Sequence, residues 1–315
     1  MREKSVSRLT VAFGMALAMA LATQAPIAAA ASTKVTIPGA PNCYLFPADN
    51  VWNERVDSLP VASNSATMVA SIGSGSYLHP DFSSISGGNY GIPYNVVGAS
   101  VAGKKVKFQY AGQSDKGPYP IPKNPKIEGG SDRHLLIVKK NTCKLYELFA
   151  ARKTATGWKA GSGAIWDMSS NALRPLGWTS ADAAGLPILP GLVRYDEVAA
   201  GAIDHALRFT APVTRRAYIY PARHYASDST DPALPPMGLR VRLKASVDIS
   251  RFGPQARVLL TALKQYGMIL ADNGSPWYVT GAPAAGWDDD DLHQLQQLHG
   301  SDFEVVDTSS LTNGP

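Results

Sequence analysis

The chain lacks the features that identify several common classes of protein. It has 315 residues but only two cysteines, and charged residues make up only 17% of it, with a net charge of +5. Two cysteines form one disulfide at most, which excludes a disulfide-rich scaffold. A weak positive charge without a basic block argues against nucleic acid as a partner. Beyond the N-terminal segment, no apolar run approaches the roughly 20 residues of a spanning helix, so we expect no membrane span.

Signature motifs of nucleotide and hydrolase chemistry are also missing. The sequence contains no G-x-S-x-G elbow, no phosphate-binding P-loop and no G-x-G-x-x-G after a predicted strand. An α/β-hydrolase and a dinucleotide-dependent enzyme are therefore disfavoured. The six histidines show neither H-x-H nor H-E-x-x-H spacing, and the acidic run Asp288–Asp291 suits the start of a helix, where it compensates the helix dipole. We expect no metal and no cofactor.

The N-terminal segment has the pattern of a secretory signal peptide. Basic residues within the first eight positions precede an uncharged apolar run from Leu9 to Thr23, and Ala29 to Ala31 form a small-residue cleavage site. We therefore expect residues 1–31 to be a signal peptide and residues 32–315 to form a single β-rich globular domain. The protein is expected to be secreted or periplasmic.

The two cysteines, Cys43 and Cys143, both lie after the predicted cleavage site. Export to an oxidising compartment predicts that they form one disulfide. The bond would close a loop of about 100 residues, which is worth ~4–5 kcal/mol in the chain-entropy model.

The pattern of apolar residues predicts a fold built mainly from strands. Glycine and proline are plentiful, at 28 and 23 residues, and short alternating segments outnumber helical ones. The predicted strands do not alternate regularly with helices, which disfavours a doubly wound sheet or a (β/α)8 barrel. We expect an antiparallel β-sandwich or jelly-roll-like core with a few peripheral α-helices, and an α+β fold is the alternative.

Three local patterns make specific structural predictions. Residues 135–149 read as two strands around a turn and predict a hairpin. Pro254 opens the clearest amphipathic helix, and Gly267 ends it. The Asn273-Gly274 pair between two apolar segments predicts a second hairpin. Both glycines are expected to have positive φ.

The candidate catalytic residues are polar side chains on apolar strand faces. Strand alternation gives Glu147 and His205 apolar neighbours on their own faces, and Asp167 shares a side with Ile165 in the predicted strand 164–168. We expect Glu147 and Asp167 to act as acid and base or nucleophile, with His205 orienting one of them. Structural roles are the competing interpretation: an arginine partner such as Arg133 or Arg208 for Glu147, a turn cap for Asp167 and a core hydrogen bond for His205.

Five further residues are candidates for substrate binding. Aromatic rings stack on the apolar faces of sugars, while polar side chains bind the hydroxyl groups. The candidates lie at a predicted strand end or near Gly, Ser and Asn loops: Trp166, Trp178, Tyr220, Arg223 and His224. Packing in the core is the competing interpretation for the tryptophans.

Export, strand content, tryptophans and inward carboxylates together predict a secreted carbohydrate-active enzyme. A polysaccharide-degrading glycoside hydrolase with paired carboxylates is the leading hypothesis, and an extracellular polysaccharide or oligosaccharide is the expected partner. One alternative is a polysaccharide lyase in which histidine and tyrosine move the protons. Another is a non-catalytic cell-wall or polysaccharide-binding protein.

Overall fold

The computed structural model describes Met1, residues 36–84 and residues 90–311. The predicted signal peptide lies outside the described residues, apart from Met1. The described residues from 36 onward belong to one compact unit. Within the described ranges, no helix is both long enough and apolar enough to cross a membrane.

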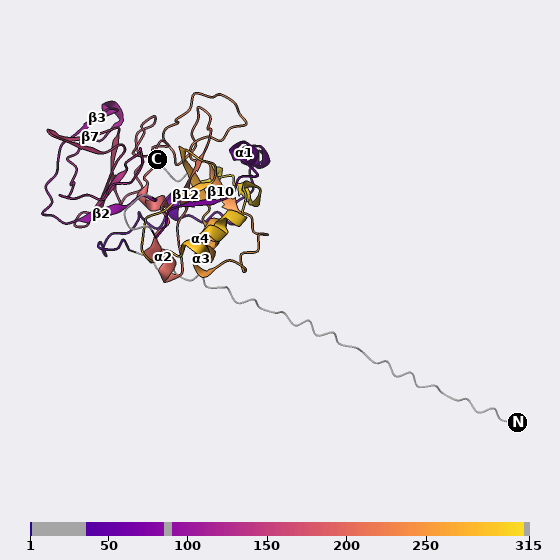
Figure 1. Ribbon diagram of the computed structural model, residues 1–315. Coiled ribbons are helices and arrows are strands. Elements are labelled where there is room, and N and C mark those ends of the chain that lie inside the picture. Colours follow the sequence, from indigo (N-terminus) through magenta and orange to yellow (C-terminus); the bar gives the residue numbers. More distant parts are fainter. Residues whose placement is uncertain (2–35, 85–89, 312–315) are drawn as a thin grey trace. The chain divides into compact units, whose positions relative to one another are not determined.

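Strands in the described part of the chain form three sheets, several strands of which are labelled in Figure 1. The largest has the order β1-β12-β9-β11-β10-β13, made of His79–Asp81, Tyr278–Thr280, Leu207–Ala211, Met268–Asn273, Arg240–Leu243 and Phe303–Val305. The second has the order β2-β4-β5-β8, made of Tyr94–Val97, Leu135–Lys139, Lys144–Leu148 and Gly163–Asp167. The third has the order β3-β7-β6, made of Val106–Phe108, Gly157–Ala160 and Arg152–Thr154.

Each of the three sheets contains parallel as well as antiparallel pairs. For example, β9 pairs with β11 in parallel and with β12 in antiparallel orientation. The sheet-rich fold agrees with the expected mainly β class, whereas the expectation of an antiparallel core was wrong. Local alternation identifies strands but does not encode the direction of a partner distant in sequence. The sandwich or jelly-roll arrangement stays a prediction.

Helices in the described residues are short. The α-helices are α1 (Ser65–Ile72), α2 (Tyr195–Ala200), α3 (Pro254–Gln265) and α4 (Asp289–His293). The 3-10 helices are η1 (Val51–Asn53), η2 (Ala111–Gln113), η3 (Leu189–Gly191), η4 (Gln294–Gln297), η5 (Gly300–Asp302) and η6 (Ser309–Leu311). Figure 1 shows α3 and α4 side by side, and the Asp291 carboxylate of α4 accepts the Gln255 N–H in the first turn of α3 at 2.8 Å. The first-turn N–H groups of α3 are thus satisfied by a neighbouring helix.

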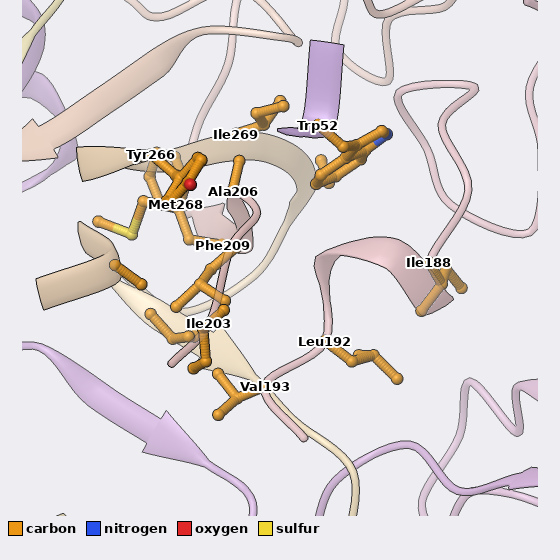
Figure 2. Close-up of a cluster of buried hydrophobic side chains, with 14 of the residues drawn as sticks. Trp52, Ile188, Leu192, Val193, Ile203, Ala206, Phe209, Tyr266, Met268 and Ile269 are labelled. Carbon is orange, nitrogen blue, oxygen red and sulfur yellow. The ribbon is translucent and has the colours of Figure 1, made fainter. Parts of the chain in front are cut away.

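The four-stranded sheet separates two hydrophobic cores. Leu136 and Val138 of β4 belong to the larger core, which also contains the apolar residues of the large sheet. Leu135 and Ile137 belong to the smaller core, which they share with Trp158 of the three-stranded sheet. Because β4 is buried on both faces, its sequence is continuously apolar instead of alternating. Figure 2 shows part of the larger core, where side chains such as Phe209, Ile203 and Val193 gather.

The structure confirms two of the three local predictions. Strands β4 and β5 form the expected antiparallel hairpin. Helix α3 begins at Pro254, and Gly267 follows it with a φ of 65°. The Cys43–Cys143 disulfide is also confirmed, with an S–S distance of 2.05 Å, and it ties the segment before η1 to the turn between β4 and β5.

The predicted hairpin around Asn273-Gly274 was wrong. Strand β9 lies between β11 and β12 and pairs with both of them. The connecting segment wraps around the end of β9: the Gly274 N–H donates to the Ala211 carbonyl at 3.0 Å, and the Trp277 N–H donates to Thr210 at 3.2 Å. The positive φ in this segment, 59°, belongs to Trp277 and not to Gly274. The Asn273-Gly274 pair therefore lies in a connection that passes a third strand, and not in a hairpin turn.

Replacing Gly267 with alanine should destabilise the protein by about 1 kcal/mol or more, because a non-glycine residue is strained at positive φ. A Cβ at this position would also collide with the Val241 carbonyl oxygen. Urea denaturation measures the loss. Gly75→Ala is the matched control, since a Cβ there meets no atom within 4 Å. Equal stability of the two variants would contradict this account of the end of α3.

Candidate functional site

A cluster of polar side chains lies where the large sheet meets the loops around the four-stranded sheet. Three members come from adjacent strands of the large sheet, one from the loop between β8 and η3, and two from the segment before β4. They are Arg208 on β9, Asp272 on β11, Thr280 on β12, Asp182, Glu128 and His134. Apolar residues surround these groups, so each polar atom requires a partner.

Asp182 and Arg208 form a buried bidentate ion pair. The Arg208 Nε and Nη2 atoms donate to the two Asp182 carboxylate oxygens at 3.0 and 2.9 Å. Arg208 Nη1 donates to the Thr280 hydroxyl at 2.5 Å. Burial opposes the charge of Arg208, but the carboxylate of Asp182 outweighs this effect and raises the pKa of the guanidinium. Two parallel hydrogen bonds fix the orientation of Asp182 as well as its charge.

Asp272 lies against this ion pair as a second acid. Burial and the negative charge of Asp182 raise the pKa of Asp272 to about 7, and the two side chains share a hydrogen bond. Both Asp182 oxygens already accept from Arg208, so the shared proton belongs to Asp272. The other contact of Asp272 is an Asn273 N–H that donates to Oδ1 at 2.7 Å. A β-bulge between Leu270 and Asp272 shifts the register at this point. Such bulges redirect side chains next to sites.

His134 and Glu128 form a second buried ion pair behind Asp182. His134 Nδ1 lies 2.5 Å from Glu128 Oε2, and Nε2 lies 3.1 Å from the Ala181 carbonyl oxygen. Both partners are acceptors only, so both ring nitrogens carry a proton and His134 is an imidazolium. Although burial opposes both charges, the hydrogen bond between them raises the pKa of His134 and lowers the pKa of Glu128.

A cavity of about 310 Å³ opens beside the two aspartates. Asp182, Asp272 and His224 line it together with the rings of Tyr110 and Phe149. His224 Nδ1 donates to the Ala183 carbonyl at 2.9 Å, and no partner within the described ranges engages its Nε2. The cavity thus brings together an acid, a histidine whose Nε2 has no partner among the described residues, and two aromatic rings. This combination supports acid–base chemistry on a small or partly enclosed ligand.

Glu147 lies in the larger core instead of this cavity. Its side chain is fully buried and accepts the Ile188 and Leu189 N–H groups at 3.0 and 2.9 Å and the Trp166 Nε1–H at 3.2 Å. Burial raises the pKa of Glu147 to about 7, although these N–H groups favour the ionised form. Neither Arg133 nor Arg208, the partners considered from sequence, contacts it: Arg133 donates to the Ala151 carbonyl and Arg208 to Asp182.

The structure does not bring Asp167 and His205 to Glu147. Asp167 is exposed and accepts the backbone N–H and the hydroxyl of Ser169 at 3.0 and 2.6 Å. His205 is buried, with Nδ1 against the Ala206 carbonyl at 2.8 Å and Nε2 against Glu197 at 3.1 Å. Both ring nitrogens of His205 thus have acceptor partners, and neither is available to a ligand.

Of the five predicted binding residues, His224 lines the cavity. Trp166 is buried and Trp178 half-buried, and the Arg174 guanidinium lies 5.7 and 5.4 Å from the two rings. Arg223 donates to the Arg174 carbonyl at 2.9 Å. Tyr220 is half-buried, and burial raises its pKa. Its segment, predicted as a strand, makes only an isolated bridge from Tyr218 to Met237.

Sequence reasoning missed Asp182, Asp272, Glu128 and His134 as site residues. One signal was present: Arg208 lies between two apolar residues of a strand that is buried on both faces. A charged residue in such a strand requires a buried partner of opposite charge. The sequence does not indicate which of the 25 acidic residues fills that role.

Glu147→Gln distinguishes a structural from a catalytic Glu147. Because its pKa is raised to about 7, folded Glu147 holds a proton that the unfolded chain releases, so its contribution to stability falls between about pH 4.5 and 7. Glutamine does not ionise, so the variant lacks this pH-dependent contribution to stability. The stability advantage of the wild type over the variant should therefore shrink by about 3 kcal/mol across that range. Urea denaturation at several pH values measures it. A catalytic Glu147 instead predicts loss of turnover in a folded variant.

Comparisons with known proteins assign no family to this chain. No protein-family model, no curated protein and no solved structure matches it. Fold class alone would not define an activity in any case, because one architecture hosts many chemistries. The function is therefore inferred from the geometry and chemistry of the cavity.

Proposed function

We propose that this protein is a secreted or periplasmic carbohydrate-active enzyme, a hydrolase that uses acid–base catalysis in the Asp182–Asp272 cavity. One observation carries the proposal: Asp272, an acid whose pKa is raised to about 7 beside an arginine-bound carboxylate, lines the same cavity as His224, whose Nε2 has no partner among the described residues. Perturbed acids in a concave site are typical of catalytic groups.

In this scheme Asp272 is the general acid. Its raised pKa keeps a proton available near neutral pH, and Arg208 binds both oxygens of the adjacent Asp182 side chain. His224 Nε2 is the group that accepts a proton from the attacking water.

The pair differs from the two separated carboxylates of most glycosidases. Those carboxyl groups lie about 5 to 9.5 Å apart, with the sugar between them. Asp182 and Asp272 share a hydrogen bond, so the substrate cannot pass between them. The scheme therefore assigns protonation of the leaving group to Asp272 and activation of water to His224. The original pairing of Glu147 with Asp167 stays a prediction, with His205 as its orienting residue.

The lining of the cavity supports a carbohydrate as the substrate. Tyr110 and Phe149 offer ring faces for stacking, and Gln113 and Thr179 contribute polar groups at the same wall. The described lining contains neither arginine nor lysine, and a lyase acting on a uronate would need such a cation for the sugar carboxylate. This favours a neutral sugar and hydrolysis over elimination. A non-catalytic sugar-binding protein is the second candidate, supported by the same aromatic lining.

Asp272→Asn tests the assignment. Asparagine can donate to Asp182 and accept the Asn273 N–H, so the fold should persist, but it cannot deliver a proton. In a screen of neutral polysaccharides for release of reducing ends, turnover should fall by about 10²- to 10⁴-fold. Wild-type activity should also fall as the pH rises through about 7, because Asp272 then loses its proton.

Asp167→Asn is the matched control, since it makes the same chemical change at an exposed aspartate. Loss of turnover in the control with full activity in Asp272→Asn would contradict the proposal and restore the pairing of Glu147 with Asp167. Glycan binding without turnover in the wild type would indicate the binding protein. Absorbance of an unsaturated product, followed in parallel, would indicate a lyase.

A further inference from the structure

The backbone carbonyl before Asp182 is held by a buried cation. His134 Nε2 donates to the Ala181 carbonyl at 3.1 Å, while Nδ1 donates to Glu128 at 2.5 Å. Glu128 also accepts the His134 backbone N–H at 3.0 Å, so the carboxylate binds both the ring and the backbone of His134. His134 is only 4% exposed, and its ring does not line the cavity. The residue therefore acts on the site through the Ala181–Asp182 peptide, through its charge, and through its ring, whose centroid lies 5.8 Å from that of the cavity-lining Phe149.

The rest of the Asp182 loop is held by separate bonds. The Ser180 and Thr179 hydroxyls donate to the Asp182 carbonyl at 2.9 and 3.2 Å. The Ala184 N–H donates to the Ala271 carbonyl at the β-bulge at 2.9 Å. The hydrogen bond from His134 Nε2 to the Ala181 carbonyl connects the Ala181–Asp182 peptide to the segment before β4.

We infer that Glu128 and His134 form a positioning pair, which holds the Ala181–Asp182 peptide at the distance that lets Asp182 share a proton with Asp272. The inference rests on the proposed role of Asp272, but it concerns the geometry of the acid pair and not the identity of the substrate. A displacement of about 1 Å in a reacting group costs roughly 10²-fold in rate. The pair is therefore placed to control turnover without contacting the ligand.

The two ways in which His134 can affect the site, by its charge or by positioning Asp182, predict opposite changes in the pKa of Asp272. The His134 imidazolium lowers the pKa of Asp272, whereas the charge of Asp182 and its hydrogen bond raise it. The other ionisable groups facing His134 and Glu128 are Asp81 and Arg208. If His134 acted only by charge, its removal would raise the pKa of Asp272. If it positions Asp182, its removal separates the two acids, and the pKa of Asp272 falls toward its ordinary value.

The experiment is a carboxyl ¹³C NMR titration of the full chain labelled at aspartate. In His134→Gln, positioning predicts that the Asp272 midpoint falls by about one pH unit, whereas a charge effect predicts a rise. Glu128→Asp keeps the charge and shortens the reach, so positioning predicts a fall and charge alone predicts no change. This second variant decides the question if His134→Gln does not fold. His205→Gln is the control, because it breaks hydrogen bonds of an equally buried histidine that does not line the cavity.

A raised midpoint in His134→Gln, or an unchanged midpoint in Glu128→Asp, would overturn the inference. So would a fall of the same size in His205→Gln, which would reflect a general loss of packing. Once a substrate is known, kcat should fall about 100-fold in both test variants with KM nearly unchanged. The titration needs no substrate, so failure of the proposed hydrolase activity and failure of the positioning role give separate results.

Discussion

The buried ion pair between Asp182 and Arg208 is the interaction on which the candidate site depends. It joins the loop after β8 to the central strand β9 of the large sheet through two hydrogen bonds. A buried pair contributes little net stability, but loss of one partner costs about 3–5 kcal/mol, because it leaves a charge without compensation. The same pair holds Asp182 beside Asp272, whose pKa burial and the charge of Asp182 raise to about 7. One contact thus serves both the fold and the chemistry of the cavity.

Several other buried charges follow the same rule of local compensation, whereas the buried Arg240 guanidinium donates to backbone carbonyls. His134 is matched by Glu128, and Glu197 is matched by both Arg194 and His205. Asp272, which has no cation of its own, is neutralised by a proton. Since an unpaired charge in a low-dielectric interior is costly, each group either binds an opposite charge or changes its protonation. Asp272 lines the cavity, where it can transfer a proton to a bound ligand.

The arrangement of the sheets explains why the cavity forms where it does. The four-stranded sheet is buried on both faces, so its strands consist largely of apolar residues. Polar groups gather instead where strands end, bulge or give way to loops, as at Asp272 on β11 and Asp182 in the loop after β8. Loops on a rigid scaffold can bring distant segments together, and here the lining of the cavity comes from six separate segments of the chain.

Local patterns in the sequence were sufficient for elements that depend on near neighbours. They predicted the β4–β5 hairpin, the helix between Pro254 and Gly267 and the Cys43–Cys143 bond. Turn chemistry and capping act between near neighbours in the sequence, and two cysteines leave a single possible disulfide. The positions of Glu147 and His205 on apolar faces were also recognised, but burial alone did not reveal their partners. Only the tertiary structure decided that β9 separates β11 from β12 and that Arg208 pairs with Asp182, 26 residues away. A strand's pattern records which of its sides is buried, and it does not record which distant side chain lies opposite.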